Sequence, residues 1–153
     1  MFILQVIQSL NNQRVNYAIV GGYAVALHGA IRGTVDIDLV ININKLQFLR
    51  AEQALSAIGL QPRLPVSAAE VFDFRAEYIQ NKNLTAWSFY NPANPLEVVD
   101  IIITHNLKNI QTINKKVDRL NIKVASIPDL IAMKKQAAHP QDIEDVKALE
   151  KLL

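Results

Sequence analysis

The 153-residue sequence contains no cysteine. Disulfide bonds, thiolate metal sites and a cysteine nucleophile are therefore excluded, and the absence fits a reducing cytoplasm. No apolar run approaches the roughly 20 residues that a membrane-spanning helix needs, so a membrane is not an expected partner. The apolar start, MFILQVIQSL, has no basic region before it, and we interpret it as an amphipathic helix and not as a signal peptide.

The sequence also has little excess of either charge, because its net charge is only +2. A strongly basic nucleic-acid-binding domain would carry a larger excess. Basic residues nevertheless gather in the last third of the chain, at Lys108, Lys115, Lys116, Arg119, Lys123, Lys134 and Lys135. They are either an electrostatic footprint for a polyanion or a solvated face, and the sequence leaves both open.

The length and the 50% hydrophobic content indicate one domain with a substantial core. Hydrophobic spacing and turn residues predict strands at residues 17–20, 35–41, 71–79, 84–90, 96–103 and 122–126. Helices are expected at residues 2–10, 23–30, 45–58, 106–113, 127–138 and 141–153. Asn44 and Ser126 are expected to cap two of these helices. Helices before, between and after strands predict an α+β or α/β fold.

Two carboxylates stand one residue apart in the apolar segment VDIDLVI. On a strand, Asp36 and Asp38 point to the same side, where two negative charges favour a divalent cation. Oxygen ligands suit Mg²⁺, which binds one or two carboxylates together with substrate phosphates. A third carboxylate is expected from Asp100, the acid in the apolar run LEVVDIII, whereas Glu97 has the opposite parity and faces away.

The pair Gly21-Gly22 lies between an expected strand and an expected helix. Such a junction presents backbone N–H groups and the positive end of a helix dipole, an arrangement that binds phosphate. Arg32 would contact phosphate oxygens, and Thr34 would orient Asp36 or donate to a phosphate. Each feature also has an ordinary structural explanation: a glycine pair is often a turn, and an Asp-x-Asp motif is often solvated.

Taken together, the segment GGYAVALHGAIRGTVDIDLV resembles the signature of the DNA polymerase β-type nucleotidyltransferase superfamily. It is most similar to the AbiEii-like small nucleotidyltransferases of bacterial toxin–antitoxin and phage-defence systems. Asp100 matches the third acid in type and order. The segment SIPDLIAMKKQAAHPQDIEDVKAL resembles the C-terminal helices of that group, in which a lysine precedes an Asp-x-x-Asp pair.

The resemblance implies one nucleotidyltransferase-like domain over residues 1–153, with a core of about 15–125 and a C-terminal helical segment of about 126–153. It implies a mixed β-sheet flanked by helices, with the active site at one edge of the sheet. Many superfamily members carry Gly-Ser where this chain has Gly-Gly, which leaves phosphate binding to backbone N–H groups or Thr34.

The resemblance also assigns roles to residues. Gly21, Gly22, Arg32, Thr34 and Lys134 would bind the nucleotide. The catalytic, metal-binding residues would be Asp36, Asp38 and Asp100, holding Mg²⁺ or Mn²⁺. Asp142 and Asp145 would place the last helix against the site.

The expected reaction transfers a nucleoside monophosphate from an NTP such as ATP to a hydroxyl of a tRNA, a protein or a small molecule, and releases pyrophosphate. The alternative is a catalytically inactive nucleotide-sensing or partner-binding module with the same fold. A P-loop kinase is disfavoured because the sequence has no Gly-x-x-x-x-Gly-Lys-Ser/Thr segment.

Overall fold

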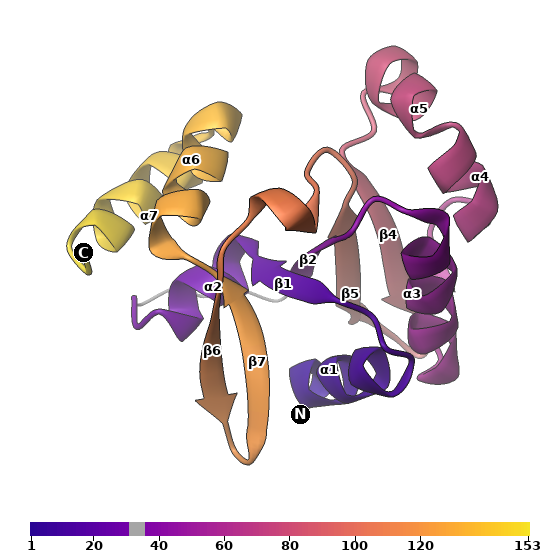
Figure 1. The fold of residues 1–153 in the computed structure, drawn as a ribbon, viewed down its shortest axis with the longest axis horizontal. Coiled ribbons are helices and arrows are strands. Elements are labelled where there is room, and N and C mark those ends of the chain that lie inside the picture. The colour runs from indigo at the N-terminus through magenta and orange to yellow at the C-terminus, as the bar shows by residue number, and fades with distance from the viewer. Residues whose placement is uncertain (31–35) are drawn as a thin grey trace.

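The computed structural model describes residues 1–30 and 36–153, in which helices surround one mixed β-sheet (Figure 1). The strands are β1 (Tyr17–Val20), β2 (Ile37–Ile41), β3 (Gln61–Pro62), β4 (Ala86–Asn91), β5 (Asn94–Ile102), β6 (Thr112–Val117) and β7 (Leu120–Ala125). The helices are α1 (Phe2–Asn12), α2 (Gly21–Leu27), α3 (Lys45–Ala57), α4 (Ala68–Asp73), α5 (Arg75–Lys82), α6 (Ile127–Ala137) and α7 (Pro140–Glu150), with a 3₁₀ turn η1 (Leu107–Asn109).

The strands of the described residues follow the order β3-β4-β5-β2-β1-β7-β6. β2 pairs antiparallel with β1 and parallel with β5, and β7 pairs parallel with β1. The remaining neighbours are antiparallel hairpins or edge pairs. The predicted mixed sheet flanked by helices is therefore confirmed.

One face of the sheet carries the largest part of the core. Alternate residues of β2, β5 and β4 share this face, because Leu39 lies opposite Ile101 and Ile101 lies opposite Trp87. All three are buried, and Phe48 of α3 stacks on Trp87 with ring centroids 5.7 Å apart. Alternation then directs the intervening residues of the same strands to the opposite face.

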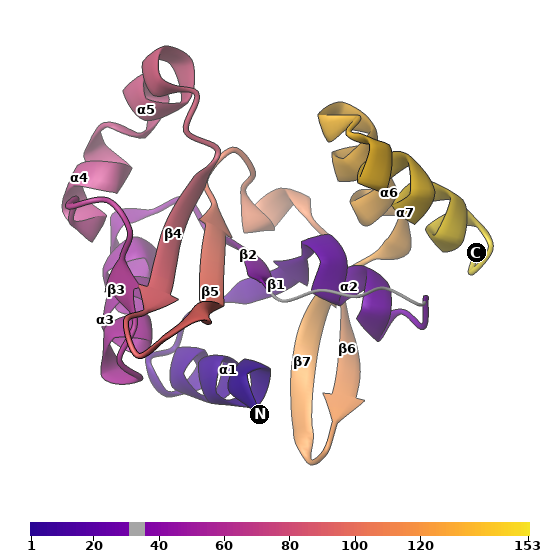
Figure 2. The same cartoon turned by 180° about the vertical axis from the view of Figure 1, so that it is seen from behind.

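Helices α1 and α3 lie side by side over this core (Figures 1 and 2). The apolar residues whose spacing predicted α1 form the buried face of this helix, at Ile3, Val6, Ile7 and Leu10. Asn44 and Ser126 cap α3 and α6 as expected, since each side-chain oxygen accepts a hydrogen bond from the N–H three residues later.

Two predicted elements are wrong. Residues 71–79, expected as a strand, belong to α4 and α5, because Ser67 and Glu70 form a capping box that starts a helix. Residues 106–113, expected as a helix, contain only the short turn η1 and then the start of β6. The sequence reading also missed β6 as a strand, although it pairs along its whole length with β7.

Helices α6 and α7 lie together on the other side of the molecule from α3, α4 and α5 (Figures 1 and 2). α6 approaches α2, which directly follows β1. None of the helices in the described residues is long and apolar enough to cross a membrane.

Candidate functional site

Two carboxyl groups meet on the sheet face that α1 and α3 leave uncovered. Asp38 of β2 and Asp100 of β5 are register partners in neighbouring parallel strands, and their carboxyl groups form a hydrogen bond. Ser88 of β4 is the register partner of Asp100 on its other side, and its hydroxyl donates to Asp100 Oδ1 over 2.5 Å. The sequence thus places Asp38 and Asp100 together, and we refer to them as the acid pair.

The carboxyl group of Asp38 has a raised pKa. Burial, followed by the charge of Asp100, the charge of Asp36 and the hydrogen bond with Asp100, raises the pKa of Asp38 to about 7. The nearby Lys134 ammonium opposes this rise in pKa. A proton shared by two carboxyl groups cancels one of their two negative charges, and a metal cation bound by both groups would relieve the same repulsion.

Asp36 lies immediately before β2 and is exposed to solvent. Although the residue is exposed, partial burial of its carboxyl group and then the charge of Asp100 raise the pKa of Asp36, while the Arg63 guanidinium lowers it. These influences place Asp36 within electrostatic range of the acid pair and of Arg63. It therefore lies at the same site as the other two predicted acids.

The chemistry of the acid pair fits a hard divalent cation, because its ligands are carboxylate oxygens whose mutual repulsion a dication relieves. In residues 1–30 and 36–153, no three His, Cys, Asp or Glu side chains are already gathered at metal-ligand spacing. Asp38 and Asp100 form a close pair, and the charge of Asp36 acts on Asp38. Substrate phosphates commonly complete the coordination of Mg²⁺.

Gly21 begins α2 in direct contact with the acid pair. Its φ of +68° lies in the left-handed region, and a Cβ at this position would overlap the Asp38 carboxyl, with only 2.9 Å to Asp38 Cγ. Glycine is therefore required both for the backbone conformation and for the approach of Asp38. Gly22 follows, and no side chain of the described residues caps the start of α2.

Lys134 reaches the same region from α6. Its side chain is buried, with Nζ 2.8 Å from Asp145 Oδ2 and 3.4 Å from Asp142 Oδ1 of α7. Gln141 also donates to Asp145 over 3.0 Å. These contacts join the two C-terminal helices and fix the ammonium group close to Asp38. The predicted lysine and both predicted acids are thus brought together, with the acids bound directly to the lysine.

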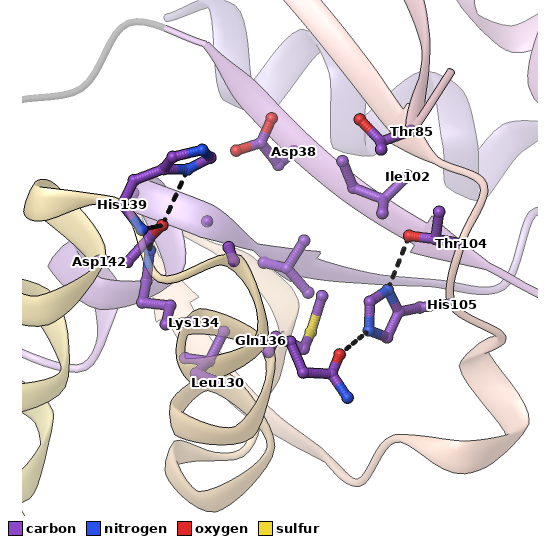
Figure 3. Close-up of a pocket in the computed structure, with 15 residues that line it drawn as sticks. Asp38, Thr85, Ile102, Thr104, His105, Leu130, Lys134, Gln136, His139 and Asp142 are labelled. Atoms are coloured by element: carbon purple, nitrogen blue, oxygen red, sulfur yellow. Dashed lines mark hydrogen bonds and ion pairs between the residues drawn. The ribbon is translucent and has the colours of Figure 1, made fainter. Parts of the chain in front are cut away.

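A pocket of about 750 Å³ connects these groups (Figure 3). Asp38, Gly21 and Gly22 line one side, and Lys134, His139 and Asp142 line the side formed by α6 and the start of α7. The other lining residues that the structure describes are uncharged apart from the imidazole His105, and they are Val20, Thr85, Ile102, Thr104, His105, Leu130, Met133, Gln136 and Ala137.

His105 bridges the uncharged part of the pocket. Its Nδ1 lies 3.0 Å from the Thr104 hydroxyl, and its Nε2 lies 3.3 Å from Gln136 Oε1, as Figure 3 shows. Which ring nitrogen donates in these two contacts depends on the tautomer of His105. His105 therefore ties the segment after β5 to α6.

Arg32 and Thr34, predicted to bind the nucleotide, lie outside the described residues. Sequence reasoning missed Ser88 and Arg63, which lie on the far side of Asp100. The alternation of apolar and polar residues in β4 is visible in the sequence, but only the register between β4 and β5 shows that Ser88 lies beside Asp100. Arg63 follows a two-residue strand and gave no recognisable signal. The expectation of a site at a sheet edge is wrong in one respect, since β2 and β5 are interior strands.

The model of a family described as "Nucleotidyl transferase of unknown function (DUF2204)" matches residues 2–153. Among curated proteins, none matches the sequence.

Several solved structures share the fold. The lincosamide antibiotic adenylyltransferase LnuA, in a lincomycin-bound crystal structure, is similar with a TM-score of 0.67 and 16% identity over 99% of this chain and 96% of that chain. The antibiotic-resistance factor ANT(2'')-Ia has a TM-score of 0.66 and 11% identity over 97% and 80% of the two chains. A nucleotidyltransferase-like protein from Paracoccidioides brasiliensis has a TM-score of 0.60 and 17% identity over 99% and 75%. At these identities the likeness shows the fold.

Proposed function

The chain belongs to this family of nucleotidyl transferases, and from that premise we propose that it transfers a nucleoside monophosphate from an NTP to an acceptor hydroxyl. The observation that carries the proposal is the juxtaposition of Asp38 and Asp100 on neighbouring strands, with Gly21 at the start of α2 against Asp38 and a pocket of about 750 Å³ beside them. In this arrangement a metal-binding carboxylate pair lies next to backbone N–H groups suited to phosphate.

The residues have distinct proposed roles. Asp38 and Asp100 hold Mg²⁺ or Mn²⁺, with Asp36 as the third acid. Gly21 and Gly22 admit the triphosphate close to the backbone. When bound, the metal ions stabilise the charge that develops on the attacking and leaving oxygens.

Lys134 is proposed to act on the nucleotide phosphates from the opposite wall of the pocket. Asp142 and Asp145 keep its ammonium group in place, since both bind it directly. Arg32 and Thr34 are kept as proposed phosphate contacts on the strength of their positions in the sequence.

The proposed transfer is a substitution at the α-phosphorus. The acceptor oxygen forms a bond to this phosphorus, and the bond from the phosphorus to the bridging oxygen breaks. The electron pair of the broken bond leaves with pyrophosphate, and the proton of the acceptor hydroxyl passes to Asp100. Asp100 is suited to this step because Ser88 fixes one of its oxygens.

The test is pyrophosphate release from each of the four NTPs with Mg²⁺ or Mn²⁺, with a tRNA pool, a protein mixture and small hydroxyl compounds, including a lincosamide, as acceptors. Asp38→Asn and Asp100→Asn are expected to abolish release. Asp118→Asn, an isosteric change at an exposed turn between β6 and β7, is the matched control and is expected to keep it. NTP binding without release over all these acceptors would instead favour a nucleotide-sensing module. The AbiEii-like subgroup and a place in a toxin–antitoxin system stay proposals that this assay does not address.

A further inference from the structure

A row of side chains crosses the sheet on the face that carries the acid pair. Asp38, Asp100 and Ser88 lie on the neighbouring strands β2, β5 and β4, each the register partner of the next. Arg63 continues this row, because it follows β3 and its backbone N–H donates to the Ser88 carbonyl over 2.8 Å. With strands about 4.8 Å apart, the row from Asp38 to Arg63 is roughly 14 Å long.

The two ends of this row have different neighbours in the sheet. Beside Asp38 lies β1, which leads into Gly21 and Gly22, the proposed triphosphate site. Beyond Asp100 lie β4 and then β3, at the outer edge of the sheet (Figure 2). In an in-line displacement the attacking oxygen approaches from the side opposite the leaving pyrophosphate. If the pyrophosphate leaves toward α2, the acceptor must arrive from the side of β4.

A separate cavity of about 230 Å³ lies on that side, lined by Arg63 and Ser88. The rest of its lining is apolar: Leu64, Val66, Leu84, Ala86 and Trp87. The volume is below the roughly 300–1,000 Å³ of pockets that enclose a whole drug-sized ligand. The cavity therefore has room for one ring or side group of a larger molecule.

Arg63 is the only charged side chain among the described residues that line the cavity. It is exposed, and Asp36 lies within its electrostatic range. The carboxyl groups of Asp36 and Asp100 lie outside the lining of the cavity. A cationic group inside the cavity would be repelled by the guanidinium, whereas an anionic group would be attracted to it.

From this arrangement we infer that the cavity between β4 and residues 63–66 is the acceptor subsite. It takes an acceptor whose hydroxyl is attached to a small apolar or aromatic group and which carries a negative charge. The apolar group fills the cavity, Arg63 binds the charge, and the hydroxyl lies toward Asp100 beside Ser88. This inference rests on the proposed nucleotidyl transfer and names its acceptor class.

Trp87 provides a direct reporter of occupancy. It is the only tryptophan in the sequence and lines the cavity. Its buried Nε1 has no hydrogen-bond partner within the described part of the chain. The protein therefore has a single indole N–H signal in a proton–nitrogen correlation spectrum, and its position is sensitive to a molecule that enters.

The experiment titrates the full chain with three phenols that share a ring and a hydroxyl and differ in charge: para-hydroxyphenylacetate, para-cresol and tyramine. We expect para-hydroxyphenylacetate to shift the indole signal and to bind about fivefold more tightly than tyramine, as expected for one exposed ion pair. Arg63→Gln should remove this preference. Arg119→Gln, the same change at an exposed position of the β6–β7 turn, should keep it. Ala86→Leu should fill the cavity and abolish the shift for all three.

Three results would overturn the assignment. The first is no shift with any phenol, and the second is equal or tighter binding of tyramine. The third is a shift caused by ATP that competes with the phenols, which would make the cavity a nucleoside subsite. Pyrophosphate release is measured in parallel with the acceptors named above. Release by the wild type without phenol binding refutes only the acceptor subsite, whereas phenol binding without release in any acceptor assay counts against the nucleotidyl transfer.

Discussion

Replacing Asp38 by Asn should stabilise the metal-free protein at neutral and alkaline pH. In the folded chain the pKa of Asp38 is raised to about 7, mainly by burial and then by Asp100, from an ordinary value of 3.8. The folded state therefore binds a proton more tightly than the unfolded state, and the free energy of unfolding falls as pH rises from about 4 to about 7. The difference between the two pKa values corresponds to roughly 4 kcal/mol.

Asparagine preserves the shape of the side chain without a titrating group. Its amide donates to Asp100, as the protonated carboxyl of Asp38 does. The variant should lose the part of the pH dependence that comes from Asp38. At pH 8 without divalent metal it should exceed the wild type by up to roughly 4 kcal/mol, and near pH 4 the two should be similar.

Urea unfolding followed by circular dichroism, with a chelator present and at several pH values, measures this difference. Asp118→Asn is the control, because it removes an exposed carboxylate of the same shape. Adding Mg²⁺ or Mn²⁺ at pH 8 should stabilise the wild type and leave Asp38→Asn unchanged, because the cation relieves the repulsion between the ionised carboxylates of Asp38 and Asp100. A wild-type curve that runs parallel to that of Asp38→Asn from pH 4 to 8 would refute this reasoning.

Other substitutions test the remaining contacts. Gly21→Ala should destabilise the protein by more than about 1 kcal/mol and abolish transfer, because it adds a clash to an unfavourable φ. Gly29 also has a positive φ, but a Cβ there would meet no atom of the described residues within 4 Å, so Gly29→Ala should show a smaller loss in thermal melts. Lys134→Met should cost about 3 kcal/mol in the same melts, since it leaves the buried Asp145 without its ammonium partner. Ser88→Ala should cost about 1 kcal/mol and weaken Mn²⁺ binding measured by electron paramagnetic resonance, whereas a purely structural role would leave the metal affinity unchanged.

Local signals in the sequence predicted the parts of the fold that depend on neighbouring residues. The cap at Asn44, the cap at Ser126 and the apolar face of α1 each involve residues within one or two helical turns, so the pattern alone identifies them. The same kind of signal was overlooked at Ser67, whose capping box with Glu70 starts α4. The segment VFDFRAEYI was predicted as a strand because of its apolar residues, but such a composition is compatible with a helix as well.

Contacts between distant segments were harder to predict. Strand parity indicated that Asp36 and Asp38 share a side, but only the register between β2 and β5 brings Asp100 beside Asp38. The ion pair between Lys134 and Asp145 was anticipated only as a helix-placing role, because the sequence does not say which α7 residues face α6. The edge strand β6 escaped prediction since Lys115 and Lys116 break its apolar alternation, a charge pattern typical of exposed sheet edges.

Strand order carries information about the reaction that the order of motifs in the sequence lacks. Along the chain, Gly21 and Asp38 come first, Arg63 and Ser88 follow, and Asp100 comes last. In the sheet, β2 and β5 are inserted between β1 and β4, so the acid pair separates the glycines from Ser88 and Arg63. An in-line displacement has its entering and leaving groups on opposite sides of the phosphorus, and the proposed reaction places this phosphorus at the acid pair. The crossover that places β5 next to β2 creates those two sides, and it is therefore the topological feature on which both the proposed reaction and the proposed acceptor subsite depend.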